Sequence, residues 1–214
     1  MELTEVILAR NILKANYDID PDKVVGVYPY GSRLYGTAGE KSDLDLVVIV
    51  DMIKNDYLQY ETDDLDIHFM SINHYKNKLK EHDIMALECF YNPSPYLEYP
   101  VQFQLDKPTL RKSISAICSN SWAKAGKKLE LSEEDDYIGL KSLFHSFRIL
   151  TYGIDMARED KIDFTKVGNT STVDFWNEIV GYYKQGFKWN DFKEIYKQEH
   201  NHLATTFREL APKE

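Results

Sequence analysis

The feature that most constrains the fold is the run LDLVVIV at residues 44–50, which is almost wholly apolar and rich in β-branched side chains. Its length and composition predict a buried β-strand. Asp43 and Asp45 share one face of that strand because side chains two residues apart point the same way, and the intervening leucines and valines take the opposite face. Two neighbouring carboxylates repel each other. The run therefore predicts a strand that is buried on one side and needs a cation or solvent on the other.

Further elements follow from periodicity and capping residues. The segments 24–30 and 65–71 predict two more strands, whereas the polar segment 52–61 predicts a loop. An amphipathic N-terminal helix is expected to bury Leu3, Val6, Ile7 and Leu13. Further helices are expected at 74–81 (capped by Asn73), 84–91 (capped by Asp83), 108–129, 133–159, from a cap within 170–172 to about 186, and from a cap at Asn190 onward.

Prolines at 93, 95 and 100 break the chain between these two groups of elements. We therefore predict an α/β (α+β) protein in which a small mixed β-sheet core, residues 1–100, precedes a helical subdomain, residues 101–214. A chain of 214 residues is long enough for this arrangement.

Composition narrows the classes of function. The sequence contains no apolar run long enough to span a membrane and no basic leader followed by an apolar stretch, and its two cysteines suit a reduced compartment, so we expect a cytoplasmic protein without a membrane partner. The net charge of −9 argues against a broad nucleic-acid binder. Residues 1–70 carry 14 acidic and 6 basic residues, whereas Lys107 to Lys128 contains 6 basic residues and no acidic one.

A glycine-rich segment lies between the first two predicted strands. Gly31 and Ser32 follow strand one, where backbone N–H groups and a hydroxyl can reach phosphate oxygens without obstruction by a Cβ. Four more positions in this segment could contact a triphosphate, namely Arg33, Gly36, Thr37 and Ser42. This pattern predicts a phosphate-binding loop beside the paired aspartates.

A third acid, Asp66, lies between Leu65 and Ile67 in the third predicted strand. Asp43, Asp45 and Asp66 would together form an oxygen-only site suited to Mg²⁺ or Mn²⁺ rather than zinc. Asp64 shares a face with Asp66 by the period of two, so the choice between these two acids stays open.

These motifs resemble the signature of the polymerase β-type nucleotidyltransferase superfamily, in which hG[GS] is followed by Dh[DE]h and a later h[DE]h. The matching stretches are Gly31-Ser32, Asp43-Leu44-Asp45-Leu46 and Leu65-Asp66-Ile67. The resemblance implies that the three acids bind two Mg²⁺ ions, that Asp66 serves the acceptor hydroxyl, and that the Gly-Ser turn holds a nucleoside triphosphate. A looser similarity, extending through 85–93 and 141–150, is to stand-alone bacterial and phage nucleotidyltransferases, some encoded beside RNA ligases.

A basic stripe is expected on the helix at 133–159. One side of this helix carries Lys141, His145, Arg148 and Tyr152. The pattern is compatible with a stripe that contacts phosphate and also with an ordinary solvated face. Glu88, in an apolar helix, is expected to form a structural ion pair rather than to take part in catalysis. His68 is expected to pack against its neighbours.

The resemblance implies a metal-dependent enzyme that transfers a nucleoside monophosphate from an NTP to an acceptor hydroxyl. The first hypothesis for the acceptor is an RNA (tRNA) 3′ end, supported by the basic segment and by Trp122 as a stacking residue. Transfer to a protein or to an aminoglycoside-like small molecule is the second. A non-catalytic nucleotide-binding module is the third.

Overall fold

A computed structural model describes residues 3–40, 42–51, 55–131 and 135–213 of the chain. The chain divides into two compact units, unit 1 at Met1–Gln104 and unit 2 at Leu105–Glu214. Their relative placement is not determined, and each is therefore considered by itself. Within the described ranges, no helix has the length and apolar character needed to cross a bilayer.

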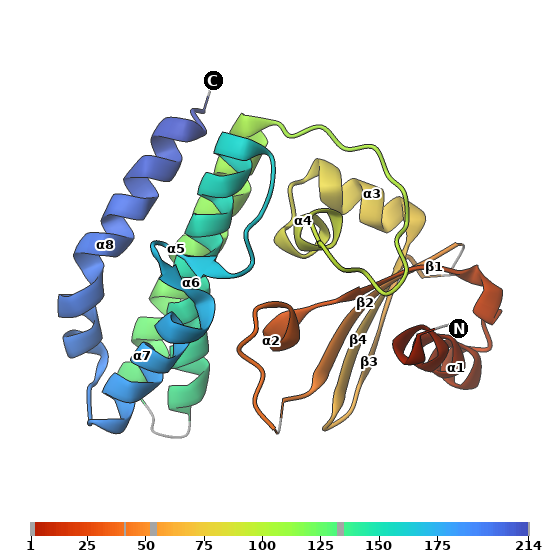
Figure 1. Cartoon of the computed structure of the whole chain (residues 1–214), viewed down its shortest axis with the longest axis horizontal. Helices are drawn as coiled ribbons and strands as arrows, with labels where there is room; N and C mark the ends of the chain where they lie inside the picture. Colours follow the sequence, from red (N-terminus) through yellow and green to blue (C-terminus); the bar gives the residue numbers. More distant parts are fainter. Residues whose placement is uncertain (1–2, 41, 52–54, 132–134, 214) are drawn as a thin grey trace. The chain divides into compact units, whose positions relative to one another are not determined.

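Unit 1 is built on a four-stranded mixed sheet with the order β1-β2-β4-β3 (Figure 1). The strands are β1 (Val24–Pro29), β2 (Leu44–Val50), β3 (Tyr57–Glu61) and β4 (Leu65–Ser71). β2 is antiparallel to β1 and parallel to β4, and β3 is antiparallel to β4. The three predicted strands are confirmed, and the run at 44–50 is a central strand with all of Leu46 to Val50 buried.

One face of the sheet is covered by helix α1 (Thr4–Tyr17), as Figure 1 shows. Val6, Ala9 and Leu13 of α1 are buried in one cluster with the side chains that alternate on β2 and β4, including Leu46 and Phe69. The prediction for α1 was wrong at two positions, because Leu3 and Ile7 are exposed. Ala9 and Ile12 take their place on the buried side. A short 3₁₀ helix, η1 (Pro21–Lys23), leads into β1.

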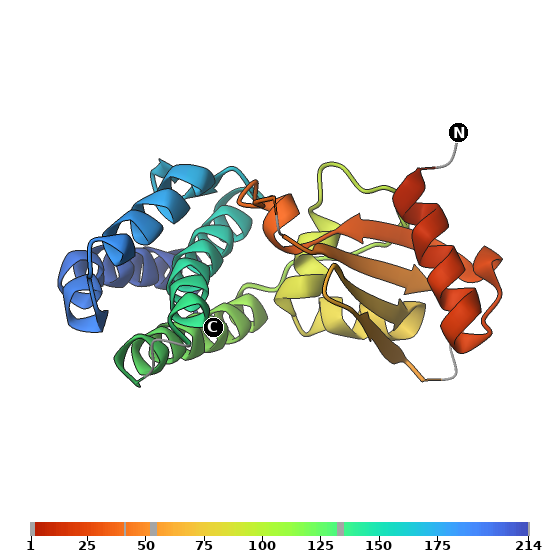
Figure 2. The same cartoon turned by 90° about the horizontal axis from the view of Figure 1, so that it is seen from below.

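The opposite face lies beneath α3 (Ile72–Lys80) and α4 (Ile84–Phe90) (Figures 1 and 2). Ser71, not the predicted Asn73, caps α3 by accepting a hydrogen bond from the backbone N–H of His74. Asp83 caps α4 as predicted. A short helix, α2 (Gly31–Leu34), begins directly after β1 and packs against β2.

The prediction of a loop throughout 52–61 was wrong, because residues 57–61 form strand β3 at the edge of the sheet. Exposed and half-buried residues alternate along β3. An edge strand with one solvated face needs few apolar residues, so its composition resembles that of a loop. At the other edge, Val27 of β1 exchanges backbone hydrogen bonds with Leu97, which covers the free side of that strand.

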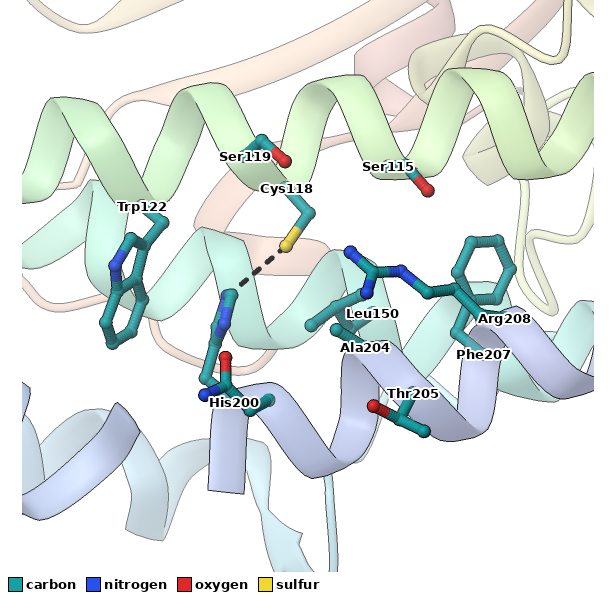
Figure 3. A pocket seen from close by; sticks show the side chains of 11 residues that line it. Ser115, Cys118, Ser119, Trp122, Leu150, His200, Ala204, Thr205, Phe207 and Arg208 are labelled. Atoms are coloured by element: carbon teal, nitrogen blue, oxygen red, sulfur yellow. Dashed lines mark hydrogen bonds between the residues drawn. The ribbon is translucent and has the colours of Figure 1, made fainter. Parts of the chain in front are cut away.

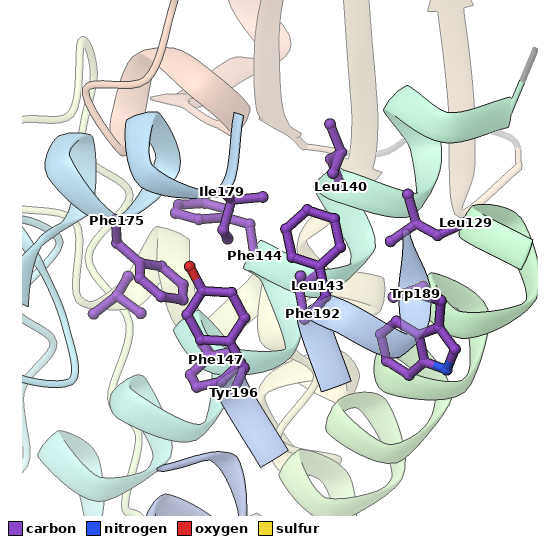
Figure 4. Close-up of a cluster of buried hydrophobic side chains, with 12 residues drawn as sticks. Leu129, Leu140, Leu143, Phe144, Phe147, Phe175, Ile179, Trp189, Phe192 and Tyr196 are labelled. Carbon is purple, nitrogen blue, oxygen red and sulfur yellow. The ribbon is translucent and has the colours of Figure 1, made fainter. Parts of the chain in front are cut away.

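Unit 2 is helical, with α5 (Lys107–Leu131), α6 (Asp136–Glu159), α7 (Thr172–Lys184) and α8 (Trp189–Leu210). Aromatic and aliphatic side chains from these helices form its core, as Figure 4 shows, with Phe147, Phe192, Phe175 and Ile179 near the centre. A small hairpin, β5 (Lys166–Val167) and β6 (Thr170–Ser171), lies between α6 and α7 and was not predicted.

The predicted helices of unit 2 are confirmed with shifted ends. Residues 133 and 134, where the helix predicted at 133–159 was expected to begin, lie outside the described residues. Ser171 caps α7 within the predicted range. The last helix begins earlier than the expected cap at Asn190, with Lys188 at the cap and Asp191 accepting its backbone N–H. Ile195 of this helix is exposed. The α+β fold class, a small mixed sheet followed by helices, is confirmed.

Candidate functional site

Asp45 and Asp66 lie opposite each other on the parallel strands β2 and β4. Their neighbours Leu46 and Ile67 are also register partners and point into the core beneath α1. Because side chains alternate along a strand, both aspartates project from the other face, and both are only partly buried. Asp43 lies two residues before Asp45, immediately outside β2, and is partly buried as well.

Gly31 lies directly against the carboxylate of Asp45. A Cβ added to Gly31 would stand 1.8 Å from Oδ2 of Asp45, and the backbone at Gly31 has φ of +63°. Both conditions require glycine. The adjacent backbone is tied to the same strand, since the N–H of Tyr30 donates to the carbonyl oxygen of Asp45 at 3.0 Å. The Gly-Ser turn and the paired aspartates therefore form one local structure, as the sequence pattern predicted.

The hydroxyl of Ser32 is buried and has no hydrogen-bond partner among the described residues. A buried hydroxyl without a partner costs free energy, so it needs a compensating role. A phosphate oxygen is an acceptor that would satisfy it. This unpaired donor follows Gly31, which lies against the Asp45 carboxylate, so the contact of Ser32 with a phosphate stays a prediction that the geometry permits.

The remaining predicted loop residues stabilise the segment that connects α2 to β2. Arg33 donates from Nε to the carbonyl oxygen of Asp43 and from its terminal nitrogen to that of Ser42, each at 3.2 Å. The hydroxyl of Ser42 accepts the N–H of Gly39, and the N–H of Thr37 donates to the carbonyl of Ser32. Gly36 has φ of +72°. Arg33 and Ser42 thus hold Asp43 in place, and their contact with a triphosphate stays a prediction.

Asp66 has side-chain partners that the sequence did not reveal. Its Oδ1 accepts a hydrogen bond from Gln59 Nε2 at 2.8 Å, and its Oδ2 lies 3.4 Å from Nε2 of His68. The other ring nitrogen of His68 lies 2.6 Å from the hydroxyl of Tyr57. Gln59 was missed because β3 was not predicted; the alternation at 57–61 was the available signal. These residues orient the Asp66 carboxylate.

The geometry favours Asp66 over Asp64 as the third acid. Asp64 lies in a bend before β4 and is exposed, and its backbone oxygen accepts the N–H of Leu44. In the described part of the chain, no three His, Cys, Asp or Glu side chains gather closely enough to form a metal-ligating group. The structure thus places Asp45 and Asp66 side by side without closing a three-carboxylate cluster.

The predicted stripe on α6 is partly buried rather than a solvated face. Arg148 is 3% exposed, stacks its guanidinium 5.2 Å from the ring centre of Tyr152, and lies 2.7 Å from Nδ1 of His145. Burial and the neighbouring Arg148 lower the pKa of His145 to about 3, so its imidazole is neutral. Lys141 is exposed and lies over the ring of Tyr137. These residues belong to unit 2, and their contact with a nucleotide stays a prediction.

Glu88 is fully buried in α4 and accepts a hydrogen bond from the hydroxyl of Tyr35 at 2.6 Å. Tyr35 follows α2, so this bond connects α4 to the turn that carries Ser32. Glu88 thus has a structural partner, as expected, but the partner identified is a tyrosine hydroxyl rather than the cation of an ion pair.

Residues 9–104 match the sequence model of the family described as "Nucleotidyltransferase domain". Unit 1 is a nucleotidyltransferase domain. The match covers nearly all of that unit, and with the sequence motifs it confirms the resemblance to the polymerase β-type superfamily. Generic nucleotidyl transfer is the activity of this domain family.

Other comparisons add little to the nucleotidyltransferase domain assignment. No curated protein matches the chain. Among solved structures, a nucleotidyltransferase-like protein from Exiguobacterium sibiricum 255-15 is similar at 10% identity, with 95% of this chain and 74% of that chain covered and a TM-score of 0.30. A score this low does not establish a common arrangement of the whole chain.

Proposed function

We propose that the chain transfers a nucleoside monophosphate from an NTP to an acceptor hydroxyl, using Asp43, Asp45 and Asp66 with two divalent metal ions. The observation that carries the proposal is the register of β2 and β4, which sets Asp45 opposite Asp66. Two carboxylates on neighbouring strands repel unless a cation lies between them.

The residues present fit Mg²⁺ and a triphosphate. All the candidate metal ligands are carboxylate oxygens, which hard cations prefer. The absence of a side chain at Gly31 leaves room for the Asp45 carboxylate, and the Ser32 hydroxyl lacks a hydrogen-bond partner in the described structure. When bound, Mg²⁺ would neutralise negative charge on the phosphates and on the leaving pyrophosphate.

Each residue then has a distinct task. The acceptor oxygen attacks the α-phosphorus, the new phosphorus–oxygen bond forms, and the bond to the bridging oxygen breaks, so that pyrophosphate leaves with its electron pair. Asp66, oriented by Gln59 and His68, accepts the proton of the attacking hydroxyl. Asp43 and Asp45 would hold a divalent ion that neutralises charge on the triphosphate, and Ser32 would donate to a phosphate oxygen.

An RNA 3′ end is our first candidate for the acceptor. Four lysines of α5 are exposed and available to a polyanion, namely Lys107, Lys112, Lys124 and Lys127. The other two basic residues of that segment have structural contacts, Arg111 with backbone carbonyls of α8 and Lys128 with Asp135. Trp122 packs against His200 and Trp189, which weakens the earlier idea that it stacks on a base.

The decisive experiment offers the protein each of the four labelled NTPs with Mg²⁺ and total RNA, and separately with total protein or an aminoglycoside. Label transferred to RNA and lost in Asp43→Ala and Asp45→Ala supports the proposal. Label transferred only to protein or to the aminoglycoside identifies the second class of acceptor. Binding of NTP without pyrophosphate release would identify a non-catalytic module, and persistent activity in both variants would refute the site.

A further inference from the structure

Unit 2 contains a pocket of about 490 Å³ between α5 and α8, floored by Leu150 of α6 (Figure 3). This volume is in the range of sites that hold small molecules. All residues that line it belong to unit 2, so it is distinct from the nucleotide site proposed in unit 1.

The charge of the pocket comes from the guanidinium of Arg208. Arg208 is the sole formally charged residue among those found to line it, and its guanidinium has no ion pair or hydrogen bond with the described side chains. The guanidinium extends from α8 toward α5 (Figure 3). Three hydroxyls line the same pocket, those of Ser115, Ser119 and Thr205. A planar guanidinium beside several hydroxyl donors is suited to an anion with several oxygens.

Cys118 and His200 do not add a second charge or a nucleophile. Sγ of Cys118 lies 3.2 Å from Nε2 of His200. Burial raises the pKa of the Cys118 thiol to about 12, and burial with the nearby Arg208 lowers the pKa of His200 to about 4. Thiol and imidazole are therefore both neutral near pH 7, whereas a catalytic pair requires a thiolate. The pocket is a binding site rather than a second active site.

The end of the pocket away from Arg208 is aromatic. Trp122 lies there, with its ring centre 4.1 Å from that of His200 (Figure 3). Ser115 and Trp122 are seven residues apart on α5, which corresponds to about 10 Å along a helix axis. The pocket thus offers a cationic, hydroxyl-rich end and an apolar end at a separation that a small organic anion can span.

We propose that this pocket binds a small phosphomonoester with an aromatic portion, its phosphate held by Arg208, Ser115 and Thr205 and its ring directed toward Trp122. A phosphate is favoured over a carboxylate because its three terminal oxygens can use the hydroxyls in addition to the guanidinium. The proposal stands independently of the reaction assigned to unit 1.

The test uses phenyl phosphate as the probe, with the full chain in EDTA and without NTP, so that metal-dependent binding in unit 1 does not contribute. Calorimetry measures affinity, and amide ¹H–¹⁵N shifts locate the ligand. We expect shifts at residues 115–122 and 200–208, and an affinity that falls about tenfold or more in Arg208→Gln. Lys197→Gln removes one exposed charge from the same helix outside the pocket and should change affinity less than twofold, by the same reasoning.

Inorganic phosphate and benzoate complete the design. Inorganic phosphate should bind more weakly than phenyl phosphate because it lacks the aromatic ring. Benzoate should also bind more weakly, because its carboxylate has two oxygens instead of the three terminal oxygens of a phosphomonoester. If inorganic phosphate binds as tightly as phenyl phosphate, the proposed contact between the ligand's ring and Trp122 is refuted. If benzoate binds as tightly or more tightly, the proposed preference for a phosphate over a carboxylate is refuted. Shifts confined to unit 1, no measurable binding, or equal affinity in Arg208→Gln would overturn the site itself. Circular dichroism of both variants checks that α8 is intact.

Discussion

Asp45 and Asp66 are direct partners in the register of the parallel strands β2 and β4. Like charges placed opposite each other destabilise a sheet. Repulsion between the two carboxylates therefore lowers the stability of unit 1 when no metal is bound. Because the same carboxylates are the proposed metal ligands, replacing one of them should change both stability and activity.

The first prediction follows from this pair. Asp45→Asn should reduce the rate of pyrophosphate release at least about 100-fold, because a charged ligand for the phosphate-side metal is lost. The same variant should unfold at an equal or higher urea concentration without metal, because a repulsion is removed. Asp64→Asn, at the exposed acid before β4, is the matched control and should leave the rate nearly unchanged. A large loss of rate in Asp64→Asn would assign the third acid differently.

Gly31 gives the second prediction. Gly31→Ala places a Cβ 1.8 Å from the Asp45 carboxylate at a positive φ, and should lower the free energy of unfolding by about 1–3 kcal/mol. Displacement of Asp45 should also reduce activity. Gly39→Ala provides the control, since a Cβ there meets nothing within 4 Å. Chemical denaturation of both variants measures the difference, and equal stabilities would show that the close approach at Gly31 is not real.

Ser32 gives the third prediction. Ser32→Ala removes a buried hydroxyl with no partner in the described structure, so stability should be unchanged or slightly increased. The KM for NTP should rise about tenfold because a phosphate contact is lost. Ser42→Ala should behave in the opposite way: it loses the bond to the Gly39 N–H and about 1 kcal/mol of stability, with a smaller effect on KM. Steady-state kinetics and urea melts on both variants separate the two roles, and an unchanged KM in Ser32→Ala would contradict the phosphate assignment.

The sequence predicted those parts of the site that are local in the chain. The run at 44–50 and the glycine at position 31 have strong intrinsic preferences, so strand β2 and the turn before it were recognisable. Gln59 was not, because an edge strand needs little apolar sequence and its contact with Asp66 depends on strand pairing. The pocket in unit 2 was likewise hidden, since Cys118 and His200 meet only when α5 and α8 pack together.

His200 gives the last prediction, on the pH dependence of stability. Burial lowers its pKa in the folded chain from the ordinary value of 6.5 to about 4, so between these values the unfolded chain binds more protons than the folded chain. Stability is therefore full above about pH 6.5 and declines as the pH falls toward about 4. The loss due to His200 should be on the order of 2 kcal/mol at about pH 5, and His145 acts in the same direction. In His200→Gln, the difference between the urea midpoints measured at about pH 7 and about pH 5 should be smaller than in the parent chain. His202 is exposed on the same helix, so His202→Gln should show the same difference as the parent chain. If both variants keep that difference, the imidazole of His200 is not buried against Cys118 and Trp122 in solution.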